Sequence, residues 1–186
     1  MPALRPFFIA VLLSTVSTIA LSEDPKANAV LHLFTDACVP NMGQPDKVRS
    51  WAADQHLQEI SAPAALELFV GAGAKGVAWA VPSSLGSFAL SIRGTTEACA
   101  VWARAADPGD VAAGFEKLMD GVRRPGLDVG LEKDTKASTL SGEARTIVYH
   151  VRPTSGTSGY AFTLLTAERS GGPFQASLQV ARASIP

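Results

Sequence analysis

Residues 88–104 read FALSIRGTTEACAVWAR, and the rest of the chain can be understood from this stretch outward. Over its first six residues, apolar side chains alternate with small or polar ones, the apolar members being Phe88, Leu90 and Ile92. A period of two is typical of a strand that buries one face. Residues 94–97, GTTE, then reverse the chain. The stretch therefore predicts two antiparallel strands joined by a tight turn.

A four-residue turn also predicts the register of this hairpin. Antiparallel partners keep a constant sum of residue numbers, so we expect Ile92 opposite Cys99 and Ala89 opposite Trp102. Cys99 then points into the core with the apolar face. Trp102 points to the other face of the hairpin.

Trp102 is the candidate binding residue. Its expected neighbours are too small or too polar to cover an indole ring, so we expect it to be largely exposed. An exposed Trp102 would anchor a partner, with Arg104 and Arg93 supplying charge at the rim, because these residue types are enriched at binding hot spots. The alternative is that another segment covers this face and makes Trp102 part of the core. The apolar runs at 77–82 and 147–151 favour that alternative, since strands buried on both sides are apolar throughout.

Residues 1–22 have the layout of a secretory signal peptide. Arg5 precedes a short apolar run, and small residues follow that fit cleavage after Ala20 or after Ser22. The run is far shorter than the ~20 residues that a membrane-spanning helix needs. We therefore expect a mature chain, residues 23–186, that is periplasmic or secreted and does not insert into a membrane.

The two cysteines of the chain, Cys38 and Cys99, both lie on predicted apolar faces. In an exported protein this favours one disulfide bond between them, and the alternative is two free buried thiols. The bond closes a loop of about sixty residues, a constraint worth about 4 kcal/mol if it acts through the entropy of the unfolded chain.

Composition and length narrow the classes of function. The 186 residues carry a net charge of −1 without a basic cluster, which argues against binding to nucleic acid. The mature length is typical of one domain with a single core. The sequence leaves the oligomeric state open.

The remaining periodicities predict an α+β fold, in which an antiparallel sheet is covered on one face by helices. Helices are expected over 26–38, from Pro45, over 61–68 (where a strand is the alternative) and after Pro108, which Asp107 can cap. Further strands are expected at 77–82, 127–132, 145–152, 160–168 and 174–182.

The sequence predicts no cofactor site, metal site or catalytic motif. Gly71, Gly73 and Gly76 spell G-x-G-x-x-G, but a short strand and not a helix is expected after them, which argues against a dinucleotide site. The histidines, at positions 32, 56 and 150, belong to three different elements without the spacing of metal ligands. We expect His150 to be a sheet residue with a satisfied hydrogen bond.

The favoured function is therefore binding: an exported protein that presents a surface to a protein partner, such as an inhibitor, an immunity factor or an envelope assembly factor. One alternative is a small exported hydrolase whose carboxylates meet only in the fold. The other is a carrier of a small ligand held between sheet and helices. An aromatic surface patch would favour the protein-binding function, and a cleft with converging titratable groups would favour the hydrolase. A large apolar cavity would favour the carrier.

Overall fold

The computed structural model describes residues 24–94, 96–139, 142–168 and 172–184, so the expected signal peptide at 1–22 lies outside the described residues. Within these ranges the strands form one eight-stranded antiparallel sheet in the order β1-β2-β3-β4-β8-β7-β6-β5. The strands are β1 (Gln58–Glu59), β2 (Gly76–Val81), β3 (Phe88–Arg93), β4 (Ala98–Ala103), β5 (Leu127–Thr139), β6 (Gly142–Pro153), β7 (Ser158–Ala167) and β8 (Ala176–Ser184).

The helices of the described residues fall close to the predicted positions. They are α1 (Pro25–Leu33), α2 (Pro45–Asp54), α3 (Pro63–Val70) and α4 (Pro108–Val122). A π-helical turn, η1 (Phe34–Cys38), and a 3₁₀ turn, η2 (Val39–Asn41), continue α1, so the last turn of the predicted helix at 26–38 is π-helical. The helix expected over 61–68 is confirmed as α3, and the strand alternative is wrong.

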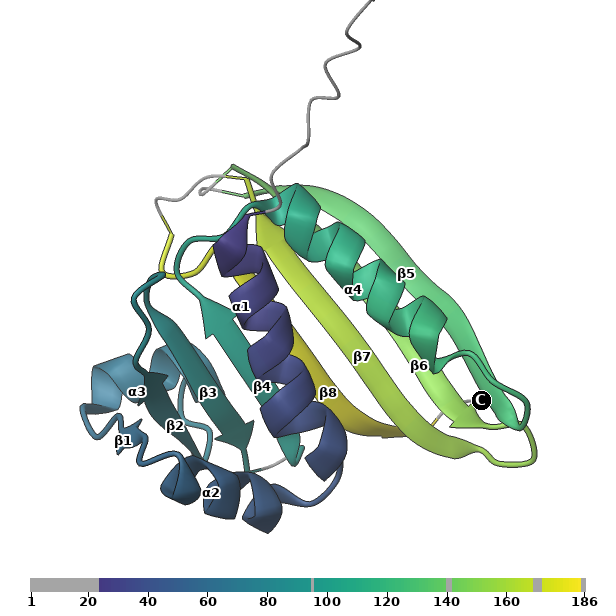
Figure 1. The fold of residues 1–186 in the computed structure, drawn as a ribbon, viewed down its shortest axis with the longest axis horizontal. Helices are drawn as coiled ribbons and strands as arrows, with labels where there is room; N and C mark the ends of the chain where they lie inside the picture. Colours follow the sequence, from purple (N-terminus) through teal and green to yellow (C-terminus); the bar gives the residue numbers. More distant parts are fainter. Residues whose placement is uncertain (1–23, 95, 140–141, 169–171, 185–186) are drawn as a thin grey trace, which may run out of the picture.

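Asp24 holds the amino-terminal ends of α1 and α4 together. Its carboxylate accepts hydrogen bonds from the backbone N–H groups of Lys26 (3.0 Å) and Asp107 (2.7 Å), and its own N–H donates to Asp110 Oδ2 (2.7 Å). One side chain thus caps α1 and fixes the start of α4. From these joined ends the two helices run over the same face of the sheet and diverge toward their carboxyl-terminal ends (Figure 1).

The predicted hairpin register is confirmed. Ile92 pairs with Cys99, and Ala89 pairs with Trp102. β2 adds a third consecutive antiparallel strand on β3, and β8, from the far end of the chain, pairs with the other edge of β4.

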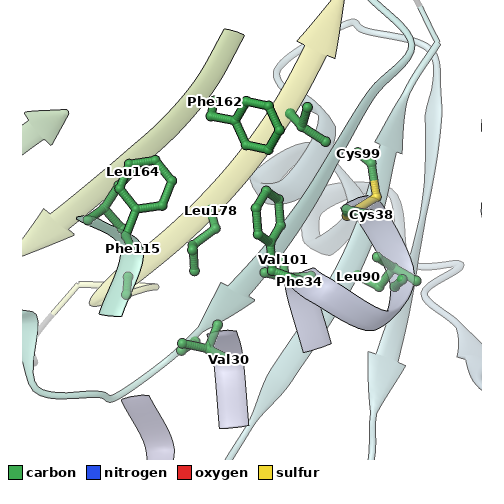
Figure 2. Packing of buried hydrophobic residues seen from close by; sticks show 14 of the residues in the cluster. Val30, Phe34, Cys38, Leu90, Cys99, Val101, Phe115, Phe162, Leu164 and Leu178 are labelled. Carbon is green, nitrogen blue, oxygen red and sulfur yellow. A yellow bond between two sulfur atoms is a disulfide. The ribbon is translucent and has the colours of Figure 1, made fainter. Parts of the chain in front are cut away.

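The main core lies between the sheet and the layer of α1, α2 and α4. Figure 2 shows Phe34 and Val101 in this core together with the bond between Cys38 and Cys99. The disulfide is confirmed, with Cα atoms 5.5 Å apart, and it fastens η1 to β4. Phe34 also meets Phe162 of β7 edge to face at 6.2 Å, so one helical segment contacts both halves of the sheet.

The expected α+β class is therefore confirmed, with helices covering one face of an antiparallel sheet. α3 is an addition on the opposite face, where Phe69 and Val70 pack on the small residues of β2, β3 and β4. No helix in the described part of the chain is both long and apolar enough to cross a membrane.

Candidate functional site: a pocket between the helix ends and the sheet

The sheet extends past the helices at one end. α4 has 15 residues and is about 22 Å long, whereas the 12 residues of β6 span about 40 Å. The divergence of α1 and α4 widens the uncovered area, and β7 is visible between them in Figure 1. Helix length and helix direction together leave part of the helix-facing side of β6, β7 and β8 without a helical cover.

A pocket of about 780 Å³ occupies this area, and we call it the wedge pocket. Its floor comes from a cross-strand row in which Val151, Tyr160 and Arg182 are consecutive partners on β6, β7 and β8. Its described lining comprises Val39, Met42, Gly121, Val122, Arg124, Leu127, Val151, Arg152, Pro153, Ser158, Gly159, Tyr160, Phe162, Arg182, Ala183 and Ser184. The volume lies within the ~300–1,000 Å³ that is usual for small-molecule sites.

The walls of the wedge pocket are mainly apolar. Val151 and Phe162 form a buried base, while Met42, Val122 and Leu127 are half-buried around it. Half-buried aliphatic side chains that converge on one hollow leave apolar surface in contact with water. A ligand that covered this surface would gain about 25 cal/mol for each Å² removed from water.

Arg182 and Tyr160 hold the loop that forms one wall. Arg182 Nη2 donates to the carbonyl of Gly43 (3.0 Å), and the Tyr160 hydroxyl donates to the carbonyl of Met42 over a longer 3.4 Å. Gly43 has a φ of +67°, and a Cβ there would lie 2.6 Å from Arg182 Nε. The loop therefore needs a glycine both for its backbone conformation and for the close approach of the guanidinium.

The charged groups of the lining are arginines, and its described part contains no carboxylate. Arg124 follows α4 and is exposed. Its neighbour Arg123 pairs with Asp120 (3.2 Å) and donates to the carbonyl of Val129 (2.7 Å). In the described residues, no hydrogen bond or ion pair involves the side chain of Arg124, so the two adjacent arginines have different surroundings.

Trp102 is not exposed, which corrects our first expectation and confirms the alternative. Its exposed fraction is 9%. Phe69 of α3 and Phe174 of the segment before β8 cover the indole, with ring centroids 5.9 and 5.0 Å away. The indole N–H donates to the hydroxyl of Ser91 at 2.9 Å, so the polar group of the ring is also satisfied. The covering segments are distant in sequence, which is why the hairpin alone suggested an open face.

The two arginines predicted beside Trp102 lie on the same face of the hairpin but differ in setting. Arg104 is exposed and borders a second, smaller hollow that is also lined by Leu68, Phe69 and Phe174. Arg93 lies at the far end of β3 and is half-buried. Its Nε is buried without a hydrogen-bond partner in the described chain. The structure thus does not gather the three residues around one exposed ring.

His150 is a sheet residue of β6, as expected, but it lacks the expected hydrogen bond in the part of the chain that the structure describes. It lies between two carboxylates, with Nε2 3.4 Å from Asp128 Oδ2 and Nδ1 3.5 Å from Glu132 Oε1, and neither nitrogen has a well-formed hydrogen bond within the described residues. Asp128 also receives Arg152 Nε at 3.0 Å, and this hydrogen bond holds the pKa of Asp128 below its ordinary value. The two carboxylates flank opposite sides of the ring, and no cluster of three potential metal ligands occurs among the residues placed by the structure.

Sequence reasoning missed the wedge pocket. A usable signal existed in β7 and β8, where Tyr160 and Arg182 continue the alternation of core residues such as Phe162 and Val180. Large polar side chains at core-facing positions indicate that the core ends there. The position of the helix ends above them is not readable from that pattern.

Comparisons with family models, curated proteins and solved structures found no match to this chain.

Proposed function

We propose that this protein is an exported binding protein, or carrier, for a small and largely apolar molecule that occupies the wedge pocket. The observation that supports this function is the pocket itself, about 780 Å³ in volume and walled by half-buried Met42, Val122 and Leu127. The disulfide is compatible with an oxidising compartment, so we place the carrier in the periplasm or outside the cell.

The hydrolase alternative has less support. Among the described residues, the fold brings carboxylates together at three places: Asp24 bridges two helix starts, Glu116 and Asp134 share Arg145 at 3.1 and 2.7 Å, and Asp128 and Glu132 flank His150 at 3.4 and 3.5 Å. None of these groups lines the wedge pocket. A pair of carboxylates facing a substrate-sized hollow would be the minimum arrangement for acid and base catalysis.

A protein partner is the second candidate. The hollow beside Trp102, about 380 Å³ in volume, presents Arg104 and the side chain of Leu68, of which 52% is exposed. Its test is a pull-down from the extracytoplasmic fraction of the source organism with the wild type, Leu68→Asp and Leu131→Asp. A partner lost only with Leu68→Asp would support this function, and equal recovery with all three proteins would argue against it.

The carrier function is tested by titrating the protein with 1-aminoanthracene, a neutral apolar fluorophore. We expect saturable binding by the wild type. Val122→Trp should weaken binding by about tenfold or more, because an indole at this position fills the hollow and removes contact surface.

Leu131→Trp is the matched control, since Leu131 is an exposed apolar residue outside the pocket. Circular dichroism melts of both variants establish that they are folded. Failure of the wild type to bind the probe, or equal binding by folded Val122→Trp, would contradict the proposal.

A further inference from the structure

We infer that the ligand of the wedge pocket is an anionic amphiphile, such as a long-chain carboxylate, whose charged group lies at the mouth beside Arg124 or Arg182. This inference rests on the proposed function and adds the chemistry of the ligand to it. It follows from the charge of the lining, the free donors of the two arginines and the position of the apolar base.

The charge of the lining favours an anion. Arg124 and Arg182 contribute cationic groups, and no described lining residue is acidic. Two other arginines are paired closely: Arg145 with Asp134 at 2.7 Å, and Arg152, which also lines the pocket, with Asp128 at 3.0 Å. A chain with a net charge of −1 has enough carboxylates to neutralise these two positions as well. Their positive charge is therefore a local property of the pocket and not a consequence of composition.

Arg124 has no structural task in the described chain. A cation near the carboxyl terminus of a helix is ordinarily explained by the helix dipole. Here Arg123 occupies that role, with its ion pair to Asp120 and its hydrogen bond to the carbonyl of Val129. Arg124 is an exposed lining residue of the pocket, and its guanidinium forms no hydrogen bond or ion pair with the described residues.

Arg182 is only partly used. One of its nitrogens donates to the carbonyl of Gly43, and its contact with Glu97 is long, at 3.8 Å between side chains that are 63% and 49% exposed. Exposed pairs of this kind contribute little. A guanidinium has five N–H donors, so several of those on Arg182 are available to a carboxylate at the mouth.

The sheet places the two cations on opposite flanks of the pocket. Arg182 belongs to β8, while Arg124 precedes β5, and the strand order separates β8 from β5 by three strand spacings, about 14 Å. Between the flanks lies the apolar base formed by Phe162 and Val151. An amphiphile therefore fits with its tail on the base and its charged end toward either flank.

The test is displacement of bound 1-aminoanthracene by dodecanoate and by dodecanol, which share a tail and differ in the charge of the head group. At about pH 8 the carboxylate is fully ionised, and we expect dodecanoate to compete about tenfold better than dodecanol. In the double variant Arg124→Gln/Arg182→Gln this preference should fall to within about twofold, while the affinity for dodecanol stays the same. Arg49→Gln, which changes an exposed arginine outside both hollows, should keep the full preference.

The outcomes separate the two proposals. Equal competition by both compounds in the wild type, or an unchanged preference in the double variant, would overturn the anionic ligand and leave the carrier function standing. Failure of the probe and both compounds to bind would overturn both. Arg182 also holds the Gly43 loop, so the double variant could alter the pocket wall. The single variant Arg124→Gln removes no contact seen in the described chain and is measured as well. It should show a smaller loss of the preference for dodecanoate.

Discussion

The indole N–H of Trp102 donates a 2.9 Å hydrogen bond to the buried hydroxyl of Ser91, its diagonal neighbour on the adjacent strand. This bond explains why a serine with no exposed surface is tolerated on the outer face of β3. It also links the hairpin to the aromatic contacts that Trp102 makes with Phe69 and Phe174. This hydrogen bond therefore joins β3 to β4 within the smaller of the two hydrophobic cores.

The first prediction concerns this bond. Ser91→Ala should lower the free energy of unfolding by about 1–3 kcal/mol, because it leaves the indole N–H buried without an acceptor. In urea unfolding, the combined variant Ser91→Ala/Trp102→Phe should be more stable than the sum of the two single changes implies, since neither group is then left unpaired. Strict additivity would show that the bond contributes nothing.

The second prediction concerns the disulfide. Mass spectrometry of the purified protein should give a mass two hydrogens below that of the dithiol, and both cysteines should resist alkylation without reductant. The bond joins residues 61 apart, so Cys38→Ser/Cys99→Ser should lose about 4 kcal/mol of stability in the chain-entropy account. Rapid alkylation of the native protein would contradict the bond.

The third prediction concerns acid stability. Burial alone raises the pKa of Asp24, but the N–H groups of Asp107 and Lys26 outweigh it and hold the pKa below the ordinary 3.8. The unfolded chain therefore binds the proton more tightly, and the contribution of Asp24 is present above about pH 4 and is lost as the pH falls through the folded pKa. Urea unfolding between about pH 5 and pH 2 should show a shallower loss for Asp24→Asn than for the wild type.

Asp36→Asn is the control for this acid series. Asp36 is an exposed carboxylate on η1 that forms no helix cap, so its variant should follow the wild-type curve. Parallel curves for the wild type and Asp24→Asn would show that the bridge between α1 and α4 does not depend on the charge of Asp24.

The fourth prediction contrasts two glycines. Gly130 pairs with His150 across β5 and β6, and a Cβ at position 130 would lie 2.7 Å from His150 Nε2. Gly130→Ala should therefore cost about 1–3 kcal/mol. Gly121→Ala, at an exposed position of α4 that borders the wedge pocket and has no atom within 4 Å of the new methyl group, should stabilise the protein by about 0.4–1 kcal/mol. Thermal unfolding with shifts of the same sign for both variants would contradict this contrast.

Local patterns were sufficient for much of the fold. The alternation of Phe88, Leu90 and Ile92 and the length of the turn determined the hairpin register, because side-chain direction in a strand depends only on parity. Asp107 and Pro108 marked the start of α4 for an equally local reason, the unpaired N–H groups of a helix start. Strand lengths were predicted less well, and β5 continues to Thr139 instead of ending near residue 132, since its outer half pairs with β6 while remaining exposed.

The sequence by itself determined most of the strands, the hairpin register, the approximate helix starts and the pairing of Cys38 with Cys99, because each follows from neighbours along the chain or from the only two cysteines present; the short strand β1 was not expected. Only the tertiary structure decided the environment of Trp102 and the existence of the wedge pocket. Trp102 is covered by Phe69 and Phe174, which come from separate segments of the chain. The pocket forms where α1 and α4 diverge over strands that are longer than the helices. The periodicity of the sequence predicts each element separately, and it does not specify how long or in which direction the packed elements lie relative to one another.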